Sequence, residues 1–191
     1  MCNDYRFRPL SDQPFEEFRQ TGVELVFPAG KPNLEPRDDI RIGDAAPVVT
    51  RSGDAVALTM TRWSWTSPQG RPVFNFRSDD RAFGGSLRCV IPADGFYEFT
   101  DALPGHKRKT KWLFTMRDSP GFWIAGVIRD GAFAMLTTRP GPDIAPYHDR
   151  QIVLLPQGRA MDWLDLTRPE AELLAPCPAG TLAVERVYPA P

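Results

Sequence analysis

Apolar and polar residues alternate in short stretches along most of the chain, a period of two that is typical of strands with one buried face. These stretches are bounded by Gly, Pro, Asn and Asp residues, which favour turns. The predicted strands cover residues 23–27, 46–50, 55–65, 87–91, 95–99, 112–116, 122–128, 132–138, 151–155 and 181–188. The Asp130-Gly131 pair between two of these strands is a strong signal for a two-residue hairpin.

Helical patterns are fewer and shorter than strand patterns. The predicted helices cover residues 11–20, 142–148, 158–165 and 169–174, while residues 28–39, with three prolines, are expected to form a loop. Because strands outnumber helices and are joined mostly by hairpins, the pattern predicts an α+β fold. We expect a curved, mostly antiparallel sheet or a barrel-like core with a few short flanking helices.

The chain has 191 residues, a length that favours a single domain over residues 1–191. Its composition, 42% hydrophobic and 25% charged, is that of a globular protein and argues against bulk disorder. No apolar run approaches the roughly 18–20 residues of a membrane helix, and the first residues hold no basic-then-apolar leader. We therefore expect a cytoplasmic protein that neither enters a membrane nor is secreted.

The cysteines are three in number, far apart in the sequence and without CxxC spacing (Cys2, Cys89 and Cys177). This pattern predicts neither a disulfide framework nor a metal site, and no cofactor is indicated. The net charge of −1 excludes a protein that binds nucleic acid through bulk positive charge, so a polyanion would need a local patch. Two basic clusters could form such a patch: Arg62, Arg71, Arg77, Arg81 and Arg88 make up the first, and Lys107, Arg108, Lys109 and Lys111 the second. For the second cluster, a solvated loop between strands is the simpler interpretation.

Cys2 carries the most chemical information. Removal of Met1 would leave it with a free α-amine beside its thiol, and the α-amine has a reference pKa near 8. An aldehyde can condense with this amine to a Schiff base, and the thiol can then close a five-membered thiazolidine ring. The same pair could instead attack an acyl group, as in N-terminal nucleophile hydrolases. The plain alternative is a frayed terminus without function.

Two further side chains could move protons. His148 precedes an apolar strand, and histidine exchanges protons near neutral pH. Glu98 would share a strand face with Phe96 and lie between Tyr97 and Phe99, a poor place for an ordinary surface carboxylate. Burial there would raise its pKa and suit it to general acid/base work, whereas an edge strand facing water would leave it structural.

Asn75 and Arg77 project to the same side of an extended segment, where they could hold a polar group and a phosphate. Trp63 and Trp65 have the same spacing of two. Trp63 could stack on a base of single-stranded nucleic acid, although a place in the core is the stronger expectation for at least one of the two rings.

Taken together, these segments resemble the SOS response-associated peptidase (SRAP) family. The matching segments are Met1-Cys2, Arg62-Trp63, Asn75-Phe76-Arg77-Ser78, residues 88–98 (RCVIPADGFYE), Leu136-Thr137-Thr138 and His148-Asp149-Arg150. Members of this family sense and shield abasic sites in single-stranded DNA. The resemblance therefore implies one SRAP-like domain that acts in the cytoplasm as a monomer, associates with the nucleoid when bound to DNA, and uses neither metal nor cofactor.

The resemblance also implies roles for individual residues. Cys2 would be the nucleophile that forms the thiazolidine crosslink, Asn75 would position it, and Glu98 and His148 would transfer protons. The implied DNA-binding residues are Trp63, Arg77, Thr138 and Arg150. The same site would release residues that precede Cys2, the autopeptidase activity, and would cleave the strand in a lyase-like side reaction.

The chain also departs from the family pattern. Asn3 and Asp4 replace a glycine and an arginine, Phe76 replaces a small residue, and the stretch between Trp63 and Asn75 is short. Asp4 removes an expected phosphate contact. Two other functions stay open, a thiol peptidase or acyl hydrolase acting on substrates other than DNA, and a non-covalent binder of single-stranded DNA.

Overall fold

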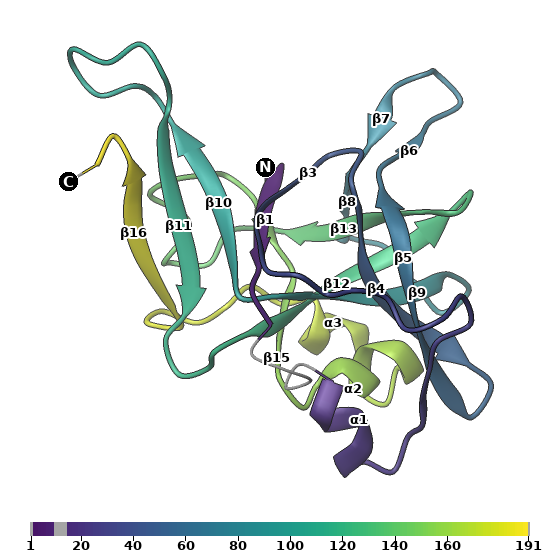
Figure 1. Ribbon diagram of the computed structural model, residues 1–191. Helices are drawn as coiled ribbons and strands as arrows, with labels where there is room; N and C mark the ends of the chain where they lie inside the picture. The colour runs from purple at the N-terminus through teal and green to yellow at the C-terminus, as the bar shows by residue number, and fades with distance from the viewer. Residues whose placement is uncertain (1, 10–14, 191) are drawn as a thin grey trace.

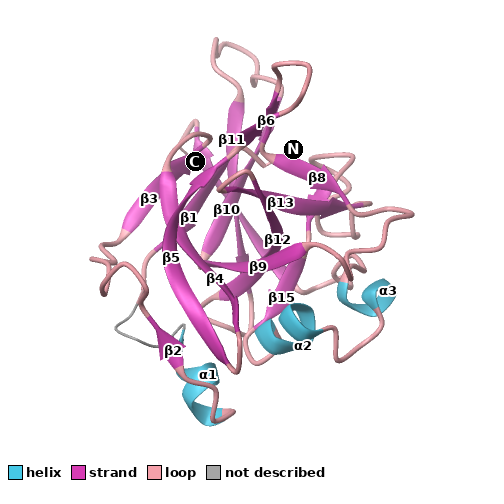
Figure 2. Cartoon of the chain, turned by 90° about the vertical axis from the view of Figure 1, so that its right-hand side faces the viewer, coloured by secondary structure: helices cyan, strands magenta, loops and turns pink. Residues whose placement is uncertain are grey.

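The computed structural model describes residues 2–9 and 15–190, and these form two curved sheets, a separate two-stranded sheet and three short helices (Figures 1 and 2). The first sheet has five antiparallel strands in the order β16-β11-β10-β1-β3. Their bounds are β1 Asp4–Phe7, β3 Arg37–Arg41, β10 Gly95–Thr100, β11 Thr110–Met116 and β16 Leu182–Tyr188.

The second sheet curls into a ring. β13 pairs with β12, β12 with β9, β9 with β4, β4 with β5, and β5 returns to β13 through a parallel pairing. The strands of the ring are β4 Ala45–Ser52, β5 Ala55–Trp63, β9 Leu87–Ala93, β12 Phe122–Arg129 and β13 Ala132–Thr138. The attached strands are β2 Leu25–Val26, β8 Asn75–Arg77, β14 Gln151–Ile152 and β15 Leu154–Pro156. The predicted α+β class with a curved, mostly antiparallel core is confirmed.

Turn chemistry explains how the chain enters and leaves these strands. Asp130 and Gly131 both have positive φ, 51° and 72°, as a two-residue turn between β12 and β13 requires, so the predicted hairpin is confirmed. Asp94 instead separates β9 from β10, which belong to different sheets, so the segment around Pro92 and Gly95 is a corner between sheets. The Asp94 carboxylate fixes this corner by accepting from Arg6 Nε at 2.8 Å and Arg8 N at 3.0 Å.

The helices gather at one end of the molecule, while the start of β1 lies at the opposite end, where the β10–β11 and β6–β7 connections project (Figures 1 and 2). The helices are α1 Glu16–Gln20, α2 Ala160–Asp165 and α3 Glu170–Leu173, and a separate hairpin pairs β6 Trp65–Thr66 with β7 Pro72–Val73. Glu17 of α1 accepts from Gly158 N at 2.7 Å, Ala160 N at 3.1 Å and Trp123 Nε1 at 2.6 Å. A carboxylate at these amides satisfies the start of α2.

Four predictions need correction. Residues 142–148 form successive turns, because Pro146 has no N–H to donate to the carbonyl of residue 142. The loop predicted over residues 28–39 contains the start of β3 at Arg37, the strand predicted over 23–27 shrinks to β2, and the strand predicted over 151–155 divides into β14 and β15. Of the helix predicted over 11–20, Glu16–Gln20 is helical, while residues 11–14 lie outside the described part.

Within the described residues, no helix is long and apolar enough to cross a bilayer.

The core of the molecule contains three buried tryptophans: Trp63, Trp123 and Trp163 are each at most 1% exposed. Arg88 from the first basic cluster belongs to this framework, since its guanidinium donates to Trp163 O, Leu164 O and Phe83 O at 2.8–3.2 Å. This arginine therefore caps the end of α2 and is not part of a basic surface.

Candidate functional site

A cleft of about 350 Å³ lies beside the start of β1 and is lined by Asn3, Glu98, Phe99, Lys109 and His148. These residues come from three places that are distant in sequence. The antiparallel register of β1 with β10, with Tyr5 opposite Phe96, brings the chain before β1 alongside Glu98. His148 follows the turns after β13 and faces the same cleft.

Cys2 is buried next to this cleft, with 1% of its surface exposed. Its thiol donates to the main-chain oxygen of Asp4 at 3.3 Å. Burial raises the pKa of the Cys2 thiol far above its ordinary value, and the negative charge of Glu98 raises it further. The thiol is therefore protonated near neutral pH and needs a base to become a nucleophile.

Asn75 fixes the main chain at Cys2. Its Nδ2 donates to Cys2 O at 2.7 Å, a contact between residues 73 positions apart. Asn75 opens β8, which pairs in parallel with β13 through the register of Asn75 with Met135. Its Oδ1 is buried and accepts no hydrogen bond within the described part of the chain, so an acceptor is available next to Cys2.

Glu98 lies in the middle of β10 and is 1% exposed. Burial raises its pKa to about 7. At neutral pH the carboxyl group is therefore divided between its acid and base forms, which is the condition for transferring protons in both directions. Of the two alternatives that the sequence left open for Glu98, a buried carboxyl group with a raised pKa and an edge-strand carboxylate facing water, the structure has the buried one.

His148 presents its ring to the cleft with 22% of the side chain exposed. Its Nδ1 lies 3.0 Å from Arg150 N and 2.7 Å from a carboxylate oxygen of Asp149. Burial lowers the pKa of His148, so the ring is neutral near pH 7, with Nδ1 accepting the Arg150 amide proton. We assign the ring proton to Nε2, which makes Nε2 the donor nitrogen of the ring.

The residues implied in DNA binding occupy different environments. Arg77 is exposed at the end of β8, whereas the Arg150 guanidinium donates to Thr137 O at 2.7 Å and pairs with Asp79. Thr138, at the end of β13, is 5% exposed. Arg77 is thus the one of these three whose side chain is freely presented to solvent.

Trp63 lies in the core with no exposed surface. Its indole stacks on Phe133 with ring centroids 6.1 Å apart and donates from Nε1 to Phe74 O at 2.8 Å. Trp65 is also buried, at 6% exposure. Trp63 therefore has no free face for a nucleobase and belongs to the core, whereas Trp65, although buried, borders a second cleft of about 420 Å³.

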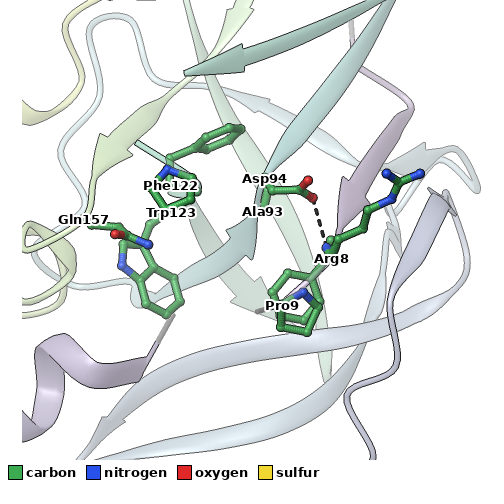
Figure 3. Close-up of a pocket in the computed structure, with 10 residues that line it drawn as sticks. Arg8, Pro9, Ala93, Asp94, Phe122, Trp123 and Gln157 are labelled. Carbon is green, nitrogen blue, oxygen red and sulfur yellow. Dashed lines mark hydrogen bonds between the residues drawn. The ribbon is translucent and has the colours of Figure 1, made fainter. Parts of the chain in front are cut away.

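Other hollows lie away from this cleft. One beneath the corner between the sheets has a volume of only about 30 Å³ and is bordered by Asp94, Trp123 and Gln157, with Arg8 N bonded to Asp94 (Figure 3). It can hold little more than a water molecule. Among the described residues, no group of three or more His, Cys, Asp or Glu side chains is arranged to hold a metal ion. All three cysteines are free thiols.

Sequence reasoning missed two contributors to this region. Lys109 lines the cleft, although the cluster containing it read more simply as a solvated loop. Lys111 lies in β11 and turns inward to Asp4. No local pattern marks either residue, because Lys109 lies just before β11 and Lys111 meets Asp4 only in the folded sheet.

The architecture is that of a curled β-sheet protein whose second residue is a cysteine held beside a cleft. A model of the family described as SOS response associated peptidase (SRAP) matches residues 1–190. The chain belongs to this family, and the resemblance seen in its sequence motifs is confirmed.

Curated relatives are similar to this chain in sequence, and solved structures share its fold. The chain is 24% identical over 187 residues to the abasic site processing proteins YobE and YoaM of Bacillus subtilis, spanning 86% of this chain and 82% and 79% of theirs. A phage-related protein of Bordetella bronchiseptica has the same fold, with a TM-score of 0.68 and 22% identity over 98% of this chain and 94% of that chain. A second protein of that organism gives a TM-score of 0.65 and 26% identity over 97% and 99%.

Proposed function

We propose that this protein processes abasic sites in single-stranded DNA by forming a covalent thiazolidine crosslink through Cys2 after removal of Met1. The observation that carries the proposal is the meeting of four side chains from separate elements: Asn75 bonded to Cys2 O at 2.7 Å, the charge of Glu98 acting on the Cys2 thiol, and His148 across the same cleft. The names of the curated relatives, abasic site processing proteins, support the choice of substrate.

The first step joins the α-amine of Cys2 to the aldehyde carbon of the ring-opened sugar. The neutral amine attacks, and the carbinolamine then loses water to give a Schiff base. Glu98 in its acid form donates the proton that leaves with the hydroxyl group, because its pKa of about 7 keeps a large acid fraction near neutral pH. The Oδ1 of Asn75 offers an acceptor for an N–H of the amine.

The second step closes the ring. The Cys2 sulfur attacks the Schiff-base carbon, the C–S bond forms, and the thiol proton passes through Glu98 to the ring nitrogen. The raised pKa of the buried thiol makes this base assistance necessary. Aldehyde and aminothiol are thereby converted to thiazolidine and one water, so no oxidant, metal or cofactor is consumed.

We expect DNA to be held by fewer side chains than the family resemblance implies. Nε2–H of His148 would donate to an oxygen of the opened sugar, and Arg77 would pair with a flanking phosphate. Arg150 would bind phosphate only by exchanging Asp79, and Thr138 would contribute from the end of β13. An abasic nucleotide has no base to unstack, so few contacts suffice for binding.

The same residues would account for two accompanying activities. Attack of the Cys2 thiol on the preceding peptide bond, with Glu98 and His148 transferring protons, would release residues before Cys2. Elimination from the Schiff base would cleave the strand. Both depend on Cys2 as the nucleophile, so they share one requirement with the crosslink.

The test uses a single-stranded oligonucleotide with one abasic site, made by uracil glycosylase. The wild-type protein should give a band that survives denaturation and an intact mass equal to the protein without Met1 plus the oligonucleotide less one water. Cys2→Ala should abolish this adduct. Cys177→Ser, which removes a half-buried thiol elsewhere, is the matched control and should retain it. Equal adduct from wild type and Cys2→Ala would refute the proposal, and salt-reversible binding alone would favour a non-covalent binder.

A further inference from the structure

The ammonium of Lys111 connects four neighbouring strands of the five-stranded sheet. Lys111 is a residue of β11, and its Nζ lies 3.6 Å from the ring centroid of Tyr97 on β10. The same Nζ lies 2.7 Å from Asp4 Oδ2 on β1 and 2.7 Å from Asp39 Oδ1 on β3. Since the strand order is β11-β10-β1-β3, one side chain crosses two strands and ties the sheet together at the start of β1.

Asp4 depends on this ammonium. Its side chain is 6% exposed, and its Oδ1 is buried without a hydrogen-bond partner in the described part of the chain. A buried carboxylate of this kind is stable only with a cation at hydrogen-bonding distance, and removing the cation leaves an uncompensated charge. Lys111 is the cation that the structure supplies.

Asp4 also holds the nucleophile. Its main-chain oxygen accepts the Cys2 thiol at 3.3 Å, and Cys2 O is held by Asn75 from the other side. The segment from Cys2 to Asp4 is therefore fixed at two points, by Asn75 of β8 and by Lys111 acting on Asp4. Lys111 itself does not line the cleft, so it would act through Asp4 without contact with substrate.

We propose that Lys111 is a positioning residue for the crosslinking reaction: through Asp4 it holds the start of β1 so that Cys2 stays in place beside Glu98. This inference rests on the proposed function and extends it to a residue outside the cleft. A misplacement of about 1 Å at a reacting group can slow a reaction about 100-fold, so loss of this anchor should affect the reaction step.

The surroundings of Asp4 predict a characteristic response to pH. The groups that face its carboxyl are the Lys111 ammonium on β11, Asp39 on β3 with Arg41 next to it, and the ring of Tyr97 on β10. Burial raises the pKa of Asp4 to about 6, with Asp39 adding to the effect and Lys111 opposing it. Protonation below pH 6 removes the charge that Lys111 holds, so the anchor weakens in acid.

The experiment compares Lys111→Met with Asp39→Asn, which removes the exposed partner of Lys111 and leaves the bond to Asp4. Two quantities are measured: the single-turnover rate of adduct formation at saturating protein, and the Kd for an oligonucleotide with a tetrahydrofuran site, which has no aldehyde. Lys111→Met should lower the rate about 10- to 100-fold and leave Kd within about twofold. Asp39→Asn should stay within about threefold of wild type in both.

Asp4→Asn supplies a second readout that a general loss of stability would not reproduce. The ratio of wild-type to Asp4→Asn rates should be largest above pH 7 and approach one near pH 5, because wild-type Asp4 is then protonated. If Lys111→Met does not fold, the double variant Asp4→Asn with Lys111→Met, which leaves no unpaired charge, should fold and show the same slow rate.

Three results would overturn the inference: an unchanged rate in Lys111→Met or in the double variant, a Kd that rises in parallel with the loss of rate, or a pH-independent Asp4→Asn ratio. A parallel rise in Kd would make Lys111 a DNA contact. In each of these cases the wild type still forms its Cys2-dependent adduct, so the proposed function stands. Absence of any adduct with the wild type would refute the proposed function and this inference together.

Discussion

The side-chain amide of Asn75 donates a hydrogen bond of 2.7 Å to the main-chain oxygen of Cys2. The bond joins β8, itself attached to the curled ring through β13, to the chain just before β1 in the other sheet. The two sheets are thus connected at the residue that we propose as the nucleophile, so its place depends on both.

Replacement of Asn75 by Ala should slow adduct formation. The Cys2 carbonyl loses its donor, at a cost of about 1–3 kcal/mol that corresponds to a roughly 5- to 150-fold lower rate if it is felt in the reaction step. Single-turnover kinetics on the abasic oligonucleotide measure the effect. Asn33→Ala, at an exposed asparagine that bonds to Glu35, is the control and should react like wild type. Equal rates for both variants would show that the bond has no part in the reaction.

Replacement of Glu98 by Gln should slow the reaction and stabilise the protein at alkaline pH. Because the pKa of Glu98 in the folded state is about 7, above the unfolded value of 4.5, its effect on stability changes with pH over this range. Below pH 4.5 the protonated carboxyl group makes its full contribution to the free energy of unfolding. This contribution is lost as the pH rises through 7.

Urea denaturation at several pH values measures this difference. Glu98→Gln should exceed wild type in unfolding free energy by up to about 3 kcal/mol at pH 8, and the gap should close by pH 4.5. Glu185→Gln, at an exposed position of β16, should show no such trend. A gap that widens toward acid would contradict the assigned direction of the pKa shift.

Replacement of Arg88 by Met should destabilise the fold without removing the chemistry. The change leaves the carbonyls of Phe83, Trp163 and Leu164 without their charged donor, which costs about 2–3 kcal/mol in unfolding free energy. Arg88→Lys should recover only part of this unfolding free energy, because an ammonium group cannot donate to three separated carbonyls as the wider guanidinium does. Thermal and urea denaturation report the loss, and Arg81→Met, from the same basic cluster, is the control. A weaker DNA affinity with normal stability would instead make Arg88 part of the DNA surface.

Replacement of Arg77 by Gln should weaken binding to single-stranded DNA and reduce the slope of log K against log salt by about one unit. Arg77 is exposed at the end of the strand that carries Asn75, so it is placed to meet a phosphate near the reacting sugar. Fluorescence anisotropy at several salt concentrations gives the slope. Arg168→Gln, in the helical end of the molecule, should leave the slope unchanged. A change of affinity with no change of slope would argue against a phosphate contact.

The sequence predicts local structure well where a strand reads as a continuous pattern closed by turn residues. The strands predicted over residues 122–128 and 132–138, with Asp130-Gly131 between them, correspond to β12 and β13 within one residue. Pairings between distant strands were out of reach, because the parallel contacts of β8 and β5 with β13 carry no local signal. Residues 142–148 were misread since their two prolines permit turns where apolar spacing indicates a helix.

For the candidate site, the residue types and their order indicated which side chains to consider, and burial decided among them. The burial of Glu98 could be considered as one alternative from the sequence, because aromatic residues lie on either side of it. Trp63 could not be separated from a surface ring by sequence, because its spacing with Trp65 suits both the core and a DNA surface. Lys111 could not be recognised as a partner of Asp4, since the two lie 107 positions apart and meet only in the folded sheet.

The strand order next to Cys2 has a consequence for how the chain is made. β1 is flanked by β3 and β10, so its second neighbour is synthesised about 90 residues after it, roughly 5 to 20 seconds later at ordinary rates of translation. Until β10 leaves the ribosome, the first residues have no completed sheet to join. If the proposed function holds, this interval gives an aminopeptidase time to reach Met1 before the sheet is completed beside Cys2, in addition to the self-cleavage proposed for the folded site.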